Sequence, residues 1–445
     1  MPSAQQLIET CKEFIRDRDP IKVCGRVIKG VGLVVEGTNP RANIGDICQI
    51  LSKGALETRV IEAEIIGFKA GTVLLMPLAD TTGVGPGDRI ISRGRQKYIK
   101  VGHSLLGRVI DGLGNPIDEK GPIRGHLYPI YNEPINPLHR KRITEPIGLG
   151  IRAIDAMLTC GKGQRMGIMA GSGVGKSILL GMIARNTAAD VNVIALIGER
   201  GREVREFLEK DLAEEGLKRS VLVVATSDTS PLMRIRAAFV ATAIAEYFRG
   251  QGKQVLFMMD SVTRFAMAQR EIGLTAGEPP TTKGYPPSVF NILPKLLERV
   301  GTCEGEGTIT GLYTVLVEGD DMNEPIADAV RSILDGHIVL SRDLANHNHY
   351  PAIDVLQSIS RLMKDIASPK QIEYVGKVLE IMSTYKRYED VITIGAYKAG
   401  TNPRLDYAIE MMDRLRGFLR QGIREGAEFN DSLSRLYALF ERGGE

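Results

Sequence analysis

The stretch Met166-Gly-Ile-Met-Ala-Gly-Ser-Gly-Val-Gly-Lys176-Ser177 decides the fold of this 445-residue chain. It begins as an apolar run of strand length and continues as a glycine-rich pattern that ends in Gly-Lys-Ser. Glycines allow backbone N–H groups to converge on a phosphate, and the N-terminus of a following helix adds partial positive charge. The pattern therefore predicts a phosphate-binding loop at Ala170–Ser177, between a strand and a helix.

Each residue of this loop has an expected task. Lys176 should reach the β- and γ-phosphates of ATP, and the Ser177 hydroxyl should ligate Mg²⁺. The first position is Ala170 where the pattern usually has glycine, which leaves the Gly-Lys-Ser end intact. The other expected nucleotide-binding positions surround the phosphates with their backbone: Gly171, Ser172, Gly173, Val174 and Gly175.

Two carboxylates complete the expected chemistry. Asp260 ends an apolar run, and a carboxylate at the end of a neighbouring strand is suited to hold Mg²⁺. Glu199 follows another apolar run in Gly-Glu-Arg-Gly-Arg-Glu, where it can project past the sheet edge and orient or deprotonate the attacking water. The structural alternative, an ion pair of Glu199 with Arg200 or Arg202, is compatible with that role. Together these residues predict a site that hydrolyses ATP.

Phosphoryl transfer is commonly accelerated by an arginine, which a neighbouring subunit can supply. An arginine in this chain is also explained by a structural ion pair, so the residues alone leave the choice open. The candidates are Arg200, Arg264, Arg331, Arg342 and Arg361.

The remainder of the chain is organised around this centre. From about residue 150 to 360, apolar strand-like runs alternate with helical ones, which is typical of a parallel sheet covered on both faces. Six short β-rich runs separated by turn residues predict a closed barrel before it. The expected parts are an amphipathic N-terminal helix (1–20), a β-barrel domain (21–95), a connector with the ATPase domain (96–365) and a C-terminal helical domain (366–445).

The strands of the α/β core are expected at 166–170, 193–198, 221–226, 254–260, 309–317 and 337–340. Those of the barrel are expected at 23–27, 33–35, 46–51, 59–68, 72–76 and 89–92. Helices are expected in the core at 177–187, 203–216, 231–249 and 325–334, and near the C-terminus at 370–385, 404–421 and 429–441.

Two further features have simpler explanations than a site. His347 and His349 look like a metal pair, but no third ligand is suitably spaced, so we expect a loop near the nucleotide. Residues 277–287 are rich in proline and glycine and should form a loop. With its basic Lys283, this loop would suit an interface or pore as well as a plain connection.

Composition restricts the functional class and the compartment. A net charge of +3, no tryptophan and only 5% aromatic residues argue against a nucleic-acid partner bound by bulk charge or stacking. The five cysteines show no metal-binding or Cys-x-x-Cys spacing, and no apolar run approaches the roughly 18 residues of a membrane-spanning helix. We expect a cytoplasmic protein that reaches a membrane through partners.

The segment Gly161–Ser177 and the run Gly198-Glu-Arg-Gly-Arg-Glu resemble the catalytic rotary ATPases. Three further runs, Gly284-Tyr-Pro-Pro-Ser-Val-Phe, Val317-Glu-Gly-Asp-Asp-Met-Asn-Glu-Pro-Ile-Ala-Asp and His349-Tyr-Pro-Ala-Ile-Asp-Val, resemble the protein-export ATPases of flagella and type III secretion. The resemblance covers roughly residues 20–440. It implies a RecA-like P-loop parallel-sheet core with an N-terminal six-stranded β-barrel and a C-terminal helical domain.

The resemblance also implies roles for single residues. The loop residues and the two carboxylates keep the tasks given above. Arg361, in Ser358-Ile-Ser-Arg361, matches the arginine that acts on a neighbouring subunit's site, and Tyr350 matches the aromatic residue that contacts adenine. The second wall of the adenine pocket is not clear from the motif, and Tyr397 is a guess for it.

The partners implied by the resemblance are those of an export motor. The family forms a homohexamer around a central stalk protein, with the barrels as a collar and the C-terminal domains facing export substrates and chaperones. The helix expected at 3–18 matches the place where a regulatory stator-like protein docks, although packing on its own domain is an alternative. The resemblance places the protein at the inner membrane, where other proteins connect it to the export gate.

The leading hypothesis is therefore the ATP-hydrolysing motor of flagellar type III export, which unfolds and delivers substrates to that gate. The secretion ATPase of an injectisome is the near alternative. A hexameric RNA-translocating helicase would need aromatic residues in its barrel, yet Phe68 is the only one in residues 21–95. A non-catalytic ring subunit would have no need of Glu199.

Overall fold

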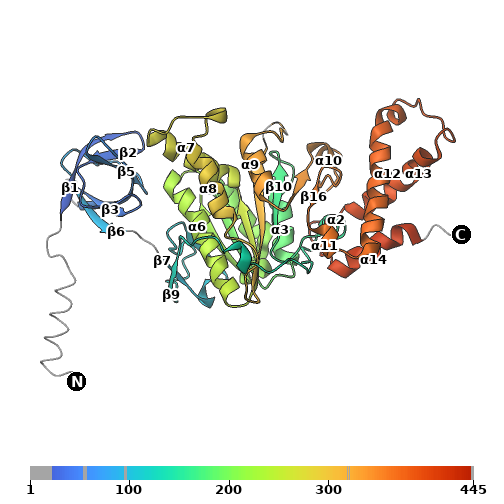
Figure 1. The fold of residues 1–445 in the computed structure, drawn as a ribbon, viewed down its shortest axis with the longest axis horizontal. Helices are drawn as coiled ribbons and strands as arrows, with labels where there is room; N and C mark the ends of the chain where they lie inside the picture. The colour runs from blue at the N-terminus through green and yellow to red at the C-terminus, as the bar shows by residue number, and fades with distance from the viewer. Residues whose placement is uncertain (1–22, 54–57, 95–97, 318, 320, 442–445) are drawn as a thin grey trace, which may run out of the picture. The chain divides into compact units, whose positions relative to one another are not determined.

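The computed structural model describes residues 23–441 except 54–57, 95–97, 318 and 320 (Figure 1). The helix expected at 3–18 lies outside the described residues. The chain divides into two compact units. One contains the residues before Tyr98 together with Ile272–Glu278, and the other contains Tyr98–Glu271 and Pro279–Glu445.

The first unit contains a closed barrel of six antiparallel strands in the order β1-β2-β5-β4-β3-β6, as predicted. Along β4, Ile61, Ala63 and Ile65 are buried, because every second side chain of a strand points to the same face. Closure pairs every strand on both sides and leaves no open edge. The strands are β1 (Cys24–Val31), β2 (Val34–Gly37), β3 (Ile47–Lys53), β4 (Thr58–Lys69), β5 (Thr72–Pro77) and β6 (Arg89–Gly94).

The second unit is built on an eight-stranded sheet in the order β16-β15-β10-β14-β13-β11-β12-β8. Every pairing is parallel except that of β15 with β16. All seven residues of β11 are buried, as expected for a strand covered by helices on both faces. The strands are β8 (Arg108–Asp111), β10 (Arg165–Ala170), β11 (Val191–Ile197), β12 (Ser220–Ala225), β13 (Gln254–Asp260), β14 (Thr308–Leu316), β15 (Gly336–Leu340) and β16 (Ile359–Ser360).

Strand β8 comes from the segment that the sequence indicated only as a connector. It adds the outermost strand of the sheet by pairing in parallel with β12. The Asp118 carboxylate fixes it by accepting hydrogen bonds from the Arg108 side chain (2.7 Å) and the Val109 N–H (2.9 Å). The same segment forms a small hairpin of β7 (Tyr98–Val101) and β9 (His126–Pro129).

Helices flank the sheet (Figure 1). The helix α6 (Pro231–Gly250) lies against β11, β12 and β13, and α7 (Val262–Thr275), α8 (Pro287–Leu297), α9 (Pro325–Ile333) and α10 (Arg342–Asn346) follow in the chain. The helix expected at 203–216 consists of α4 (Gly201–Glu206), a π-helical turn (Phe207–Leu212) and α5 (Ala213–Lys218). No helix in the described part of the chain is both long and apolar enough to cross a membrane.

The C-terminal region is helical, as predicted. Its helices are α12 (Pro369–Thr393), α13 (Pro403–Leu419) and α14 (Phe429–Glu441), after the short α11 (Met363–Ile366). Ser368 and Asn402 cap α12 and α13 by accepting hydrogen bonds from backbone N–H groups of the first turn. The apolar faces of α13 and α14 belong to the same buried cluster as the sheet, so this region shares the core.

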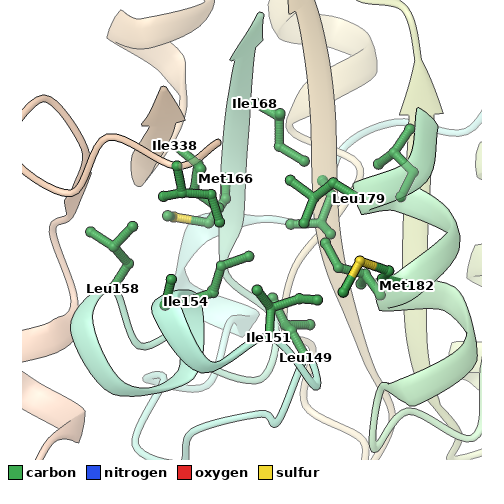
Figure 2. Packing of buried hydrophobic residues seen from close by; sticks show 14 of the residues in the cluster. Leu149, Ile151, Ile154, Leu158, Met166, Ile168, Leu179, Met182 and Ile338 are labelled. Atoms are coloured by element: carbon green, nitrogen blue, oxygen red, sulfur yellow. The ribbon is translucent and has the colours of Figure 1, made fainter. Parts of the chain in front are cut away.

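The short helix α2 (Arg152–Met157) lies at the centre of that cluster. Figure 2 shows Ile151 and Ile154 close to Met166 of β10 and to Met182 of α3 (Lys176–Asn186), and all are buried. Burying such side chains is worth about 1.5–3 kcal/mol each. The packing fixes the strand and the helix that flank the predicted phosphate loop.

Candidate functional site

The predicted phosphate loop has the expected backbone form. β10 ends at Ala170 and α3 begins at Lys176. Gly173 (φ 80°) and Gly175 (φ 91°) adopt left-handed conformations that side chains with a Cβ rarely tolerate, which explains the glycines at these positions. Val174 is buried and anchors the loop, while Ser177 is exposed in the first turn of α3.

The charged residues predicted from three separate motifs converge at one point. The Lys176 Nζ atom lies 2.5 Å from Asp260 Oδ1 and 3.4 Å from Glu199 Oε1. The Thr314 hydroxyl, on β14, donates a 2.6 Å hydrogen bond to the same Asp260 oxygen. Because β10, β14, β13 and β11 are adjacent and parallel, their carboxyl ends meet at one edge of the sheet.

Burial and charge shift the protonation of this cluster. Burial, and then the negative charge of Asp260, raise the pKa of Glu199 to about 7, although Lys176 opposes the change. A hydrogen bond with Glu203 acts in the same direction as burial. Burial disfavours the Lys176 ammonium, but the two carboxylates outweigh it and raise the pKa of Lys176. Glu199 is thus a base poised near neutral pH beside a permanent cation.

The turn that carries Glu199 is fixed by its neighbours. Gly198 has φ 73°, and a Cβ there would lie 2.8 Å from the Arg264 Cβ, so glycine is required. The Glu199 carbonyl accepts a hydrogen bond from the Ser227 N–H at 3.0 Å. The alternative ion pair with Arg200 or Arg202 is not formed: those arginines contact Glu203 (3.6 Å) and Glu206 (2.9 Å) instead.

The five candidate arginines separate in the structure. Arg264 packs on Gly198, and the Arg342 Nη1 atom donates to the Ser172 carbonyl of the phosphate loop at 3.2 Å. Arg331 contacts the Met322 carbonyl, within its own helix region.

Arg361 lies just after the edge strand β16 rather than in the charged cluster. Its guanidinium donates to the carbonyls of Leu334 (3.1 Å) and Arg331 (3.3 Å) at the end of α9, and the residue is exposed. The structure therefore brings Lys176, Glu199 and Asp260 together without Arg361.

A cavity of about 500 Å³ opens beside the loop. The Tyr350 ring closes one side, about 3.4 Å from where a Cβ on Gly175 would lie. Ile178 and Met182 of α3 also line it, and so do the residues of the segment 420–425 except Arg424. Tyr397 is not among the lining residues, since its hydroxyl bonds Asp406 at 2.9 Å in the turn between α12 and α13.

Sequence reasoning missed the wall formed by residues 420–425. Its sequence, Arg-Gln-Gly-Ile-Arg-Glu, contains no aromatic residue, so it lacks the feature by which a second wall of an adenine pocket is usually predicted. The only local signal is Gly422 after the end of a predicted helix, which marks a turn and not a binding surface.

His347 and His349 lie in different surroundings. His347 is exposed and its Nδ1 contacts the Asp343 carbonyl at 2.8 Å. His349 is buried beside Tyr350, and burial, with Arg420 and Arg416 nearby, lowers its pKa to about 4. In the described part of the chain, no three His, Cys, Asp or Glu side chains cluster as metal ligands.

Residues 277–286 form a loop between α7 and α8, with one 3₁₀ turn at Thr282–Gly284. The predicted loop is therefore one residue too long, because Pro287 begins α8. Lys283 lies 3.5 Å from Asp321, so the basic residue is paired within its own chain.

Comparison with known proteins identifies the family. The nucleotide-binding domain of the ATP synthase alpha/beta family matches residues 150–360, and the β-barrel domain of that family matches residues 27–94. The C-terminal domain of the type III secretion ATPase EscN matches residues 367–438. The flagellum-specific ATP synthase of Bacillus subtilis (strain 168) is 56% identical over 429 residues, which cover 96% of this chain and 97% of that protein.

The chain belongs to the export-ATPase branch of the ATP synthase alpha/beta family. As a member of this family it is an ATPase. A type 3 secretion system ATPase from Xanthomonas euvesicatoria is 47% identical, with 93% of each chain covered. The assembled ATPase EscN from enteropathogenic E. coli superposes with a TM-score of 0.87 at 46% identity, covering 93% of this chain and 99% of that one.

Proposed function

We propose that this chain is the ATP-hydrolysing motor of a flagellar type III export apparatus. The observation that carries the proposal is the Lys176 ammonium held between Asp260 and Glu199 at the carboxyl edge of the sheet. The injectisome role has no observation that favours it over the flagellar one, because relatives of both kinds share the core and the C-terminal domain.

The side chains present fit ATP with Mg²⁺. The exposed Ser177 hydroxyl and the Asp260 carboxylate supply the oxygen ligands that Mg²⁺ prefers, and the bound ion would neutralise charge developing on the β- and γ-phosphates. The N–H groups of residues 171–175 bind the phosphates. Lys176 exchanges its carboxylate partners for phosphate oxygens on binding. Glu199 then accepts a proton from the attacking water.

The base and ribose would occupy the cavity beside the loop. Tyr350 would stack against adenine, with residues 420–425 as a further wall of the cavity. This assignment replaces the Tyr397 guess with a segment that lines the same cavity as Tyr350.

The proposed assembly is a homohexamer in the cytoplasm, associated peripherally with the inner membrane at the export apparatus. Two structures of one relative support it: EscN has been solved as an assembled ATPase and in complex with its central stalk EscO. In such a ring, Arg361 would complete the neighbour's site. Export substrates, chaperones, a regulatory stator-like protein at residues 3–18 and the membrane export gate would be the further partners, without nucleic acid.

Two substitutions test the hydrolytic site. Lys176→Ala should abolish turnover and weaken ATP binding, because it removes the cation that contacts the phosphates. Glu199→Ala should abolish turnover yet still bind ATP, because the carboxylate acts only on water. Steady-state phosphate release and equilibrium nucleotide binding separate the two effects. Wild-type turnover in Glu199→Ala would show that another group is the base.

A further inference from the structure

We propose that Arg152 is a positioning residue that holds residues 420–425 in place as the base-side wall of the nucleotide cavity. The inference rests on the proposed function, since it takes the cavity beside the phosphate loop as the place where the base of ATP binds. Arg152 itself does not line that cavity. It acts through the segment that does.

The wall has little structure of its own to hold it. It begins where α13 ends, at Leu419, and precedes α14. Only Arg420 continues the helical bonding, because its N–H donates to the Arg416 carbonyl at 3.0 Å. Such a segment keeps one conformation only if its backbone groups are bonded to something rigid. The side chain of Ile423 in the wall remains about half exposed, so burial alone does not fix it.

Arg152 supplies two bonds to the wall and one to the end of α13 from a buried position. It is the first residue of α2 and only 4% exposed. Its chain neighbours Ile151 and Ala153 belong to the buried cluster that also contains residues of β10 and α3. Its Nε donates to the Phe418 carbonyl (2.9 Å) and its Nη2 to the Arg420 carbonyl (2.6 Å). Its Nη1 donates to Glu425 Oε1 at 2.5 Å. One guanidinium thus contacts both ends of the wall.

Gln421 continues the same attachment. Its Oε1 accepts from the Arg152 backbone N–H at 2.8 Å, and its Nε2 donates to the carbonyls of Gly150 (2.9 Å) and Glu425 (2.8 Å). The other carboxylate oxygen of Glu425, Oε2, accepts a hydrogen bond from the Gly422 N–H at 2.9 Å. The wall is therefore closed into a compact loop around the Arg152 side chain.

The wall is also bonded to both other sides of the cavity. The Gln421 N–H donates to the Tyr350 carbonyl at 2.9 Å, and the Arg185 Nη2 atom, on α3, donates to the Ile423 carbonyl at 2.7 Å. These two bonds attach the middle of the wall, and the Arg152 bonds hold its two ends, at Arg420 and Glu425. Release of the ends would therefore change the part of the cavity proposed to hold the base, while the phosphate loop stays in place.

A second attachment of the C-terminal helices provides a matched control. Gln371 of α12 is buried, and its Nε2 donates to the Ala156 carbonyl (2.9 Å) and the Thr159 hydroxyl (2.7 Å). It anchors the same helical region to the far end of α2 without touching the cavity lining. Loss of Gln371 loosens the region, whereas loss of Arg152 loosens the wall.

The test measures equilibrium binding of ATP and of inorganic tripolyphosphate, which has the phosphates but no base, to the full-length protein. Arg152→Leu should weaken ATP binding by about tenfold while tripolyphosphate binding changes less than twofold. Arg152→Lys, which keeps one donor group, should lie between Arg152→Leu and the wild type. Gln371→Leu should lower the thermal unfolding temperature without changing either dissociation constant. If Arg152→Leu does not fold, Glu425→Ala should show the same selective loss for ATP.

Each outcome has a distinct meaning. Equal weakening of ATP and tripolyphosphate, or unchanged ATP binding, in a folded Arg152→Leu or Glu425→Ala protein would overturn the role of Arg152. The same selective loss in Gln371→Leu would also overturn it, because any loosening of the helices would then suffice. A wild-type protein that binds tripolyphosphate as tightly as ATP would instead show that the cavity is not the base site.

Discussion

At the scale of single residues, the site contains one cation between two carboxylates that are themselves close together. Lys176, Asp260 and Glu199 are all largely buried, so their mutual charge is poorly screened. Burial, and then the negative charge of Asp260, raise the pKa of Glu199 to about 7, and the single cation Lys176 only partly opposes them. The pKa of Glu199 therefore follows from its surroundings in the site.

This raised pKa predicts how activity depends on pH. Glu199 can accept a proton from water only when it is ionised, and its pKa in the free protein is about 7. Because kcat/KM reports the free enzyme, kcat/KM for ATP should fall about tenfold per pH unit below that value and level off above it. Initial rates between about pH 5.5 and 9, with Mg²⁺ in excess, would test this expectation.

The control for the pH profile is nucleotide binding to Glu199→Gln. This variant cannot hydrolyse ATP by the proposed route, and its binding curve reports the protonation of ATP alone. A rate profile that followed the binding profile of Glu199→Gln would assign the inflection to the nucleotide and not to Glu199.

At the scale of elements, a buried ion pair joins α6 to the chain after α8. Arg299 and Glu246 have side chains only 1% and 3% exposed and form two hydrogen bonds, of 2.8 and 2.7 Å. Arg299 also donates to the Ile130 carbonyl, and Asn132 donates to Glu246. The network attaches the connector segment to the helices that cover the sheet.

Removal of one partner from this pair should be costly. Glu246→Ala leaves the Arg299 charge buried without its counter-ion, which typically costs about 3–5 kcal/mol. Chemical denaturation should therefore show a large loss in the free energy of unfolding. The exposed pair Lys377–Glu373 is the control: Glu373→Ala should leave the free energy of unfolding almost unchanged. Similar losses from both substitutions would contradict the argument from burial.

The elements that the sequence predicted share a strong periodic signal. The barrel strand β4 alternates, the core strands are mostly apolar, and α12 and α13 have a proline and a capping residue at their starts. β8 has only the residues Arg-Val-Ile-Asp within a segment rich in glycine and proline, so its pairing with β12 depends on tertiary contacts that no local pattern encodes.

Within the site, too, some residues follow from local sequence patterns and others depend on tertiary contacts. Lys176, Glu199 and Asp260 were predictable because parallel strands bring their carboxyl ends to one edge. The wall at residues 420–425 and its attachment to Arg152 join positions about 270 residues apart, as the 2.8 Å bond from the Arg152 N–H to Gln421 shows. A contact of this kind has no spacing rule, and a single sequence cannot reveal it.

At the scale of the whole molecule, the separation of Arg361 from the charged cluster bears on assembly. If Arg361 acts on the neighbour's site, its loss should slow hydrolysis by about 10³-fold or more. The decisive measurement mixes two inactive proteins, Lys176→Ala and Arg361→Ala. Mixed rings would contain sites with an intact Lys176 from one subunit and an intact Arg361 from the other, so ATPase activity should return.

This complementation shows whether Arg361 acts on the neighbour's site or on the site of its own chain, and the result does not depend on how stably either variant folds. If Arg361 served the site of its own chain, no subunit in the mixture would contain a complete site and no activity would return. Each protein measured alone at the same total concentration is the control.

The strand β8 has a consequence for how the molecule can be divided. A fragment that begins at residue 150, where the nucleotide-binding domain match starts, would lack β8 and expose the backbone groups of Val221–Val224 along β12. An uncovered strand edge is a template for pairing with another chain. The fragment 150–445 should therefore self-associate, whereas 98–445 should remain dispersed in light scattering at equal concentration. The boundary of autonomous folding would then precede the start of the nucleotide-binding domain match.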